Sequence, residues 1–218
     1  MMTIQFCTEV IEACEKNPGW HKHIVFSDES TFYLTGVVNR HNCNYYNLQN
    51  PHLREVEKLK SLGITVWAAV TFSGVLSFDI SVHTMNAERY CQVLRDHIIP
   101  HFDVPEMKEA LYQHDGAPAH YSNAARQILD NLLPGRWIGR RGPMEWPPRS
   151  PDLSVCDFFL WGFLKEKVYS NNLATEQQLL LTIENELCNI PKEFLNKSYD
   201  EFLTRCYRCI AVDGMQFE

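Results

Sequence analysis

The sequence lacks the features of a membrane or secreted protein. No apolar run in its 218 residues approaches the roughly 18 residues that a membrane-spanning helix requires. The longest such run, residues 64–72, has the length of a buried strand. Residues 1–10 have neither the basic flank nor the long apolar core of a secretory signal. We therefore expect an intracellular protein with no membrane partner, although no lysine-rich import signal explains a nuclear location.

Internal repeats, low-complexity tracts and an evident linker are also absent. Hydrophobic residues make up 45% of the chain and charged residues 22%, which is ordinary for a globular protein with a proper core. Cysteine is present eight times, but only Cys206 and Cys209 form a CxxC pair. This pair falls in a helical pattern with no second pair nearby, which argues against a zinc site. The cysteines are therefore expected to be reduced thiols, several of them buried.

Positive charge is scarce overall and locally concentrated. Twenty basic residues against 27 acidic ones give a net charge of −7, which argues against a protein that binds DNA through its overall field. Two bound divalent cations would bring the net charge to −3. Within residues 136–149, however, a single acid accompanies four arginines: Arg136, Arg140, Arg141 and Arg149. This segment is either a solvated loop or a DNA-facing one, and its place just before Asp157 favours contact with DNA.

Hydrophobic periodicity predicts a mixed α/β fold with a helical tail. Expected strands cover residues 23–26, 36–46, 64–72, 75–82 and 110–113, and expected helices cover residues 4–13, 86–99, 122–132 and 153–168. Two capping-box patterns, Thr175–Gln178 and Ser198–Glu201, are expected to open the last helices. Trp67 lies in an apolar strand pattern and is expected in the core rather than as a platform for base stacking.

Two aspartates are each expected to follow a short buried strand. Asp28 comes after residues 23–26, on the strand face that carries Ile24 and Phe26, while Glu29 points to the other face. Asp115 follows residues 111–114, and a Gly-Ala-Pro sequence then ends the strand. Functional groups collect at the carboxyl ends of strands in α/β sheets. Taken singly, each residue is also a typical turn-forming aspartate, and the pairing is what favours a site.

Asp157 is expected at the centre of an apolar helix stripe formed by Leu153, Leu160, Trp161, Leu164 and Val168. A buried carboxylate needs a partner, either a metal ion or backbone amides and an arginine. Asp152 is expected at a helix N-cap and Glu166 on the opposite, solvent face. Three carboxylates from separate elements suit a pair of Mg²⁺ or Mn²⁺ ions that catalyse phosphoryl transfer.

Three sequence blocks resemble the catalytic motifs of mariner-type DDE/D transposases. They are Ser-Asp-Glu-Ser at 27–30, His-Asp-Gly-Ala-Pro-Ala-His at 114–120, and residues 146–161, which contain Ser-Pro-Asp followed five residues later by Asp157. The resemblance covers roughly residues 20–170. It implies an RNase H-like fold with catalytic, metal-binding Asp28, Asp115 and Asp157, two Mg²⁺ or Mn²⁺ ions, DNA cleavage, and transfer of the 3′-hydroxyl into target DNA. His114 and His120 belong to the motif and are expected to orient metal or DNA, or else to serve local packing.

The resemblance also predicts how the chain is divided. Residues 1–22 would form a residual helix and linker, 23–170 the RNase H-like catalytic domain, and 171–218 helices packed on it. The 27 residues before Asp28 are too few for the two helix-turn-helix modules of the family, so a truncated copy is expected. The 41 residues between Asp115 and Asp157 exceed the spacing usual for mariner proper.

Three functions are compatible with these residues. The preferred one is a nuclear transposase core whose partners are DNA and, through residues 39–60, a second copy of the chain, with no small-molecule substrate. The alternatives are a non-catalytic, domesticated module for nucleic-acid binding or dimerisation, and a related RNase H-like nuclease. The intact set of acids argues against the non-catalytic module, while the negative net charge favours it.

Overall fold

The computed structural model describes residues 2–34, 63–171 and 173–215, and these contain a six-stranded mixed sheet in the order β3-β2-β1-β4-β5-β6. The strands are β1 Ile24–Tyr33, β2 Gly63–Thr71, β3 Gly74–Ser81, β4 Leu111–Gln113, β5 Trp137–Gly139 and β6 Met144–Glu145. The first three form an antiparallel meander, whereas β4 runs parallel to β1 and the next two strands continue in parallel.

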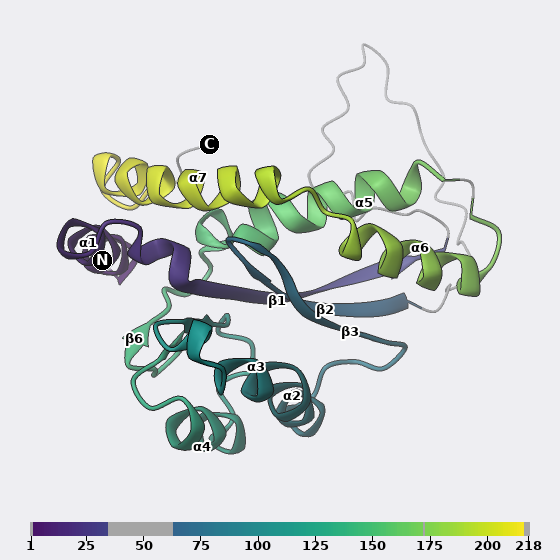
Figure 1. Ribbon diagram of the computed structural model, residues 1–218, viewed down its shortest axis with the longest axis horizontal. Coiled ribbons are helices and arrows are strands. Elements are labelled where there is room, and N and C mark those ends of the chain that lie inside the picture. Colours follow the sequence, from purple (N-terminus) through teal and green to yellow (C-terminus); the bar gives the residue numbers. More distant parts are fainter. Residues whose placement is uncertain (1, 35–62, 172, 216–218) are drawn as a thin grey trace, which may run out of the picture.

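Helices cover both faces of this sheet (Figure 1). One face carries the helices from the two ends of the chain, α1 Met2–Lys16, α5 Trp161–Tyr169, α6 Glu176–Cys188 and α7 Lys192–Ala211. The other face carries α2 Ala87–Val93, α3 Ile99–Phe102 and α4 Asn123–Leu132. The α2 and α3 helices flank a π-helical turn, Leu94–Ile98, so the helix expected over residues 86–99 is present but irregular. No helix within the described ranges is long and apolar enough to cross a membrane.

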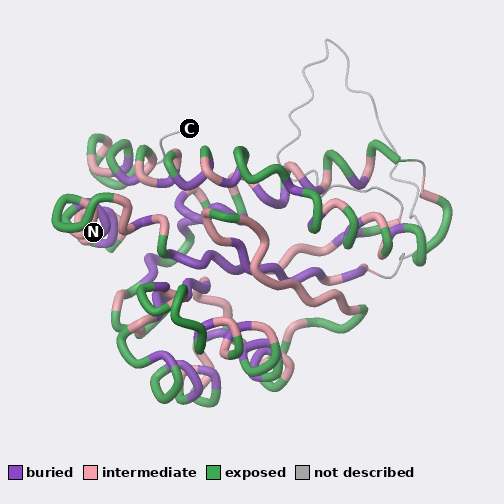
Figure 2. Tube along the Cα trace, in the orientation of Figure 1, coloured by how far each residue is buried: buried purple, intermediate pink, exposed green. Residues whose placement is uncertain are grey.

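The alternation of side chains along β1 divides the core into two clusters. Ile24 and Phe26 pack under the terminal helices, whereas Val25 packs with Trp67 on the opposite face. Trp67 is 1% exposed, so its predicted place in the core is confirmed. Figure 2 shows β1 as a largely buried path through the centre of the molecule. Because β1 runs through the interior, the residues that come directly after Phe26 also lie inside the molecule.

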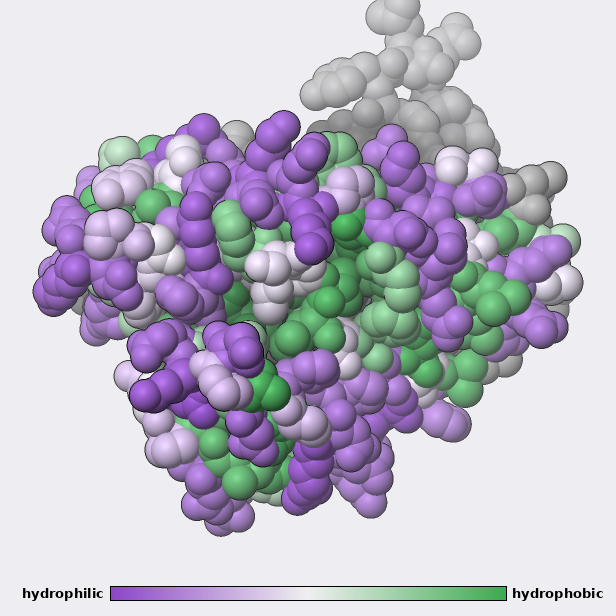
Figure 3. Space-filling view, in the orientation of Figure 1, coloured by the Kyte–Doolittle hydropathy of each residue, from purple (hydrophilic) through white to green (hydrophobic). Residues whose placement is uncertain are grey.

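The outer strand β3 is less enclosed than its neighbours. Every one of its residues is half-buried, and in Figure 3 hydrophobic residues collect across the middle of the visible face between hydrophilic helices. The α6 helix and the π-helical turn contact this strand. No further strand among the described residues pairs with β3. Side chains of α6 and of the π-helical turn shield this edge of the sheet instead.

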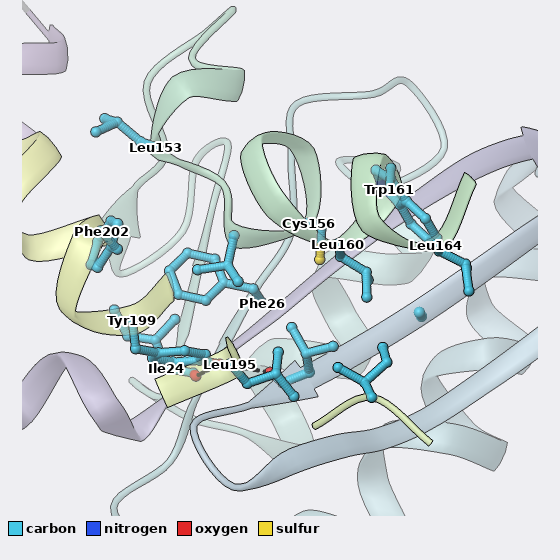
Figure 4. Packing of buried hydrophobic residues seen from close by; sticks show 14 of the residues in the cluster. Ile24, Phe26, Leu153, Cys156, Leu160, Trp161, Leu164, Leu195, Tyr199 and Phe202 are labelled. Atoms are coloured by element: carbon cyan, nitrogen blue, oxygen red, sulfur yellow. Dashed lines mark hydrogen bonds between the residues drawn. The ribbon is translucent and has the colours of Figure 1, made fainter. Parts of the chain in front are cut away.

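The last helix is attached to the sheet by a buried tyrosine. The hydroxyl of Tyr199 lies 2.8 Å from the carbonyl oxygens of both Ile24 and Val70, so it bridges β1 and β2. Its ring meets Phe26 edge-on at 5.4 Å, and Phe202 packs on the same phenylalanine at 5.0 Å (Figure 4). These contacts hold the amino-terminal half of β1 against α7.

Several sequence predictions need correction. The strand after residue 23 continues to Tyr33, so Asp28 lies inside it rather than at its end.

The Thr175–Gln178 capping box is confirmed. Ser198 lies within α7 and donates to the carbonyl oxygen of Phe194, so it opens no helix. The short strands β5 and β6 were not predicted. The predicted strand 36–46 and loop 39–60 lie outside the described residues.

Tyr199→Phe should lower the free energy of unfolding by about 1–2 kcal/mol, because it removes the one hydroxyl proton that two buried carbonyl oxygens share. Urea denaturation of the variant would measure this. Tyr207→Phe is the matched control, since Tyr207 lies on the same helix and is 51% exposed. Equal stability of the two variants would contradict the bridging role of Tyr199.

Candidate active site

The three predicted aspartates line one cleft of about 610 Å³. Asp28 comes from β1, Asp115 from the loop after β4, and Asp157 from the π-helical turn Cys156–Leu160. The parallel pairing of β1 and β4 aligns the first two, because Phe26 pairs with Gln113 and each aspartate follows two residues later. Sheet register therefore brings together residues that are far apart in the sequence.

Asp28 is held by an indole and surrounded by other acids. The Nε1–H of Trp161 donates to its Oδ2 at 2.8 Å, and its Oδ1 makes no hydrogen bond to a described residue. Burial and then the charges of Asp157 and Glu29 raise the pKa of Asp28 well above its usual value. The folded protein thus keeps a carboxyl group where its ionised form is disfavoured unless a cation is close.

Asp115 is held by a backbone amide and by an imidazole. The amide of Ala117 lies 2.9 Å and Nδ1 of His120 lies 2.5 Å from its Oδ1, while Nε2 of His120 lies 2.9 Å from Oε1 of Glu29. Burial opposes ionisation of Asp115, but the hydrogen bond and charge of His120 outweigh it, and the pKa of Asp115 is lowered. Burial would lower the pKa of His120, but its two acidic neighbours raise it to about 10.

The position of Asp157 differs from the prediction. Leu160, Trp161 and Leu164 are buried as expected, yet Asp157 is exposed to the cleft. A 3₁₀ turn at Pro151–Leu153 and the π-helical turn that follows change the phase of the helix, so its 100° periodicity does not extend back to residue 157. Asp152 lies within the 3₁₀ turn and caps no helix. Glu166 is exposed, as predicted.

The surroundings of Asp157 still disfavour its charge. Loss of hydration at the cleft wall and the charge of Asp115 raise its pKa to about 6, although Ser154 hydrogen-bonds with its side chain and lowers it. Because Asp157 is open to the cleft, solvent screens part of this effect. The cleft therefore combines two carboxyls that resist ionisation with one, Asp115, that is already paired.

Of the four arginines expected to face DNA, two line the cleft and two do not. Arg140 and Arg149 line the cleft, and the Arg140 guanidinium lies 4.1 Å from the centre of the Tyr121 ring. Arg141 is exposed beside them. Arg136 points elsewhere, since its Nη1 donates to the carbonyl of Met107 at 3.1 Å. The segment 136–149 is therefore a pair of short strands with two arginines at the cleft.

One relative matches most of the chain in sequence. The Tc3 transposase of Caenorhabditis elegans is 30% identical over 167 residues, which are 74% of this chain and 47% of the relative. The chain thus spans about half the length of that protein. No protein-family model matches the sequence.

Solved structures match the fold over its full length. The crystal structure of the catalytic domain of Mos1 mariner transposase has a TM-score of 0.73 at 20% identity and covers 99% of this chain and 94% of that domain. A Mos1 transposase paired-end complex with the left transposon end gives 0.76 at 20% identity, over 100% of this chain and 62% of that one. The chain is thus similar in sequence to a transposase and has the fold of the mariner transposase catalytic domain. The predicted RNase H-like fold with a helical C-terminal region is confirmed.

The domain contains partners of the aspartates that the sequence did not reveal. Trp161 was assigned only to the core, and Glu29 only to the opposite face of β1. Both carry a hydrogen bond to the site. His114 and His120 are 0% and 2% exposed, so direct contact of either ring with DNA is incompatible with this structure. Burial lowers the pKa of His114 to about 3, which makes it a neutral packing residue.

The oxygen donors of this cleft fit Mg²⁺ or Mn²⁺. No group of three His, Cys, Asp or Glu side chains in the described ranges is close enough to bind one ion by itself. Mg²⁺ does not require such a group, because it keeps several waters and takes one or two carboxylates together with substrate phosphates. The fully buried amide of Gln113, at the cleft wall, has no hydrogen-bond partner among these residues. A polar ligand in the cleft would satisfy it.

Asp28→Asn should raise the free energy of unfolding of the metal-free domain by about 1 kcal/mol, because it removes a carboxyl group whose ionised form is disfavoured by burial and by neighbouring acids. Mn²⁺ should raise the melting temperature of the native protein but not of the variant. Both effects are measured by thermal and urea denaturation with and without Mn²⁺.

The matched control is Asp130→Asn. Asp130 also accepts from an indole, Trp137 Nε1 at 3.1 Å, but it is exposed and lies outside the cleft. This variant should respond to Mn²⁺ as the native protein does. A metal-free Asp28→Asn protein that is less stable than native would show that Asp28 serves structure alone.

Proposed function

We propose that this chain is the catalytic core of a cut-and-paste DNA transposase, which cleaves DNA strands and transfers their 3′-hydroxyl ends with the help of divalent metal ions. The observation that carries the proposal is the convergence of Asp28, Asp115 and Asp157, from three separate segments, on one cleft that Arg140 and Arg149 also line. Carboxylates for metal and guanidinium groups for phosphate are the two components that phosphoryl transfer on DNA needs.

Each cleft residue has a role in this proposal. Asp28, Asp115 and Asp157 would bind two Mg²⁺ or Mn²⁺ ions, which when bound activate the attacking oxygen and stabilise the leaving one. Trp161 fixes one oxygen of Asp28, and Ala117 with His120 fixes one oxygen of Asp115, so each carboxylate keeps its second oxygen for a cation. Arg140 and Arg149 would bind the phosphates that flank the cleavage point.

The matched proteins support the ligands proposed here. Mos1 transposase catalytic-domain structures with Mn and with Mg match the fold at TM-scores of 0.75 and 0.74, and Mos1 complexes with transposon ends match at similar values. We extend divalent metal and DNA to this chain on that basis and on its own carboxylates and arginines. The homodimer and the nuclear location remain predictions.

Purified protein should nick supercoiled plasmid in the presence of Mn²⁺, and EDTA should prevent this. Asp157→Asn should abolish nicking while leaving the protein folded, because the amide removes a metal-binding charge from an exposed side chain. Agarose-gel separation of plasmid forms, with circular dichroism of each protein, measures both outcomes.

Two results would change the conclusion. Nicking retained by Asp157→Asn would remove Asp157 from the mechanism. No nicking by a folded native protein would favour the non-catalytic interaction module, which the net charge of −7 also favours.

Arg140→Gln and Arg149→Gln should each weaken the binding of duplex DNA. Each should also reduce the slope of the logarithm of the binding constant against the logarithm of the salt concentration by about 1, which corresponds to one lost phosphate contact. Fluorescence anisotropy of a labelled duplex at several salt concentrations measures the slope. Arg136→Gln is the matched control from the same segment, since its guanidinium binds backbone carbonyls outside the cleft. An equal effect of all three variants would indicate a general charge effect rather than contacts in the cleft.

A further inference from the structure

A single buried imidazole connects the two aspartate-bearing segments of the sheet. His120 is 2% exposed, and its Nδ1 and Nε2 lie 2.5 Å from Asp115 Oδ1 and 2.9 Å from Glu29 Oε1. Glu29 follows Asp28 directly on β1 and points to the opposite face of the sheet. His120 therefore adds a side-chain link between these two segments to the backbone pairing of β1 with β4.

Packing fixes the plane of this ring. Tyr90 lies against one side with ring centres 4.2 Å apart, and His114 is stacked with it at 5.6 Å and an interplanar angle of 12°. Tyr90 is in turn anchored, because its hydroxyl lies 2.6 Å from Nδ1 of His114 and 2.9 Å from the hydroxyl of Tyr112. The imidazole therefore cannot rotate without disturbing a buried aromatic group.

The hydrogen-bond geometry requires both ring nitrogens of His120 to donate. Each faces a carboxylate oxygen, and a carboxylate can only accept, so the ring is bound as an imidazolium. When all are ionised, as metal binding would require, Asp28, Glu29, Asp115 and Asp157 carry four negative charges, which this ring reduces to three. Two divalent cations would then leave a net charge of +1, which suits a phosphodiester.

The same geometry determines which oxygen of Asp115 remains for a cation. Its Oδ1 accepts from both His120 and the amide of Ala117, whereas Oδ2 makes no hydrogen bond to a described residue. Without the imidazole, the amide of Ala117 would be the only donor to this carboxylate among the described residues, and the Asp115 side chain is 46% exposed. The carboxylate could then rotate about its terminal bond.

We propose that His120, held by Glu29, is a positioning residue that fixes Asp115 with Oδ2 presented to the metal ion. The proposal rests on the metal-dependent function proposed above. His120 itself touches neither the cation nor DNA and acts through Asp115.

Two isosteric substitutions separate positioning from packing. An asparagine amide nitrogen lies near the place of Nδ1 and can still donate to Asp115, whereas a glutamine amide nitrogen lies near Nε2 and can reach only Glu29. His120→Gln should weaken Mn²⁺ binding about 10–100-fold, as loss of a partner of a metal ligand usually does, and His120→Asn should weaken it much less. The dissociation constants come from the electron paramagnetic resonance signal of free Mn²⁺, and circular dichroism checks folding.

Equal Mn²⁺ affinity of native protein and a folded His120→Gln variant would overturn the proposal, as would equal losses in the two variants, which a purely structural histidine would produce. No Mn²⁺ binding by the native protein would overturn both the proposed function and the positioning role. Native binding without DNA cleavage would overturn the function alone.

A second measurement does not depend on the variants folding. In native protein labelled with ¹⁵N-histidine, both ring N–H protons of His120 should be visible and protected from exchange at neutral pH, since both donate in the interior. Detection of only one would contradict the two-sided bond and overturn the proposal.

Discussion

The parallel pairing of β1 with β4 is the constraint on which the rest of the site depends. The rung that joins Phe26 to Gln113 places Asp28 and Asp115 at equal distance along neighbouring strands. A shift of β4 by one residue in this register would turn Asp115 to the face of the sheet opposite Asp28. The two core clusters, one on each side of β1, maintain the register because every inward side chain of the strand has its own apolar environment.

The acidic residues of the site destabilise the folded protein, whereas the sheet and its two core clusters stabilise it. The pKa values of Asp28 and Asp157 are raised, and hydrogen bonds with Trp161 and Ser154 only partly oppose this, whereas Asp115 is paired with His120. Proteins commonly retain such conflicts only where function requires them. The attachment of α7 to the sheet by Tyr199, and the packing of Phe26 and Phe202 beneath it, offset this cost close to the residues that cause it.

Much of the fold was predictable from periodicity, because long strands such as β2 and regular helices such as α4 have a strong pattern. The three-residue and two-residue strands β5 and β6 are too short to show alternation, so the arginine segment was expected to be a loop. The aspartates were identified from motif order, but the exposure of Asp157 was not, since a π-helical turn has no sequence signature in a 100° pattern. The roles of Glu29 and His120 depend on contacts between residues 91 positions apart, which a single sequence does not reveal.

The most direct measurement of the central claim is the anomalous scattering of crystals soaked in Mn²⁺. Density peaks are expected in the cleft, within ligand distance of free oxygens of Asp28, Asp115 and Asp157, and they should be lost in crystals of Asp157→Asn. Peaks elsewhere on the protein, or none in a cleft open to solvent, would contradict the assignment of these three carboxylates to one catalytic metal site.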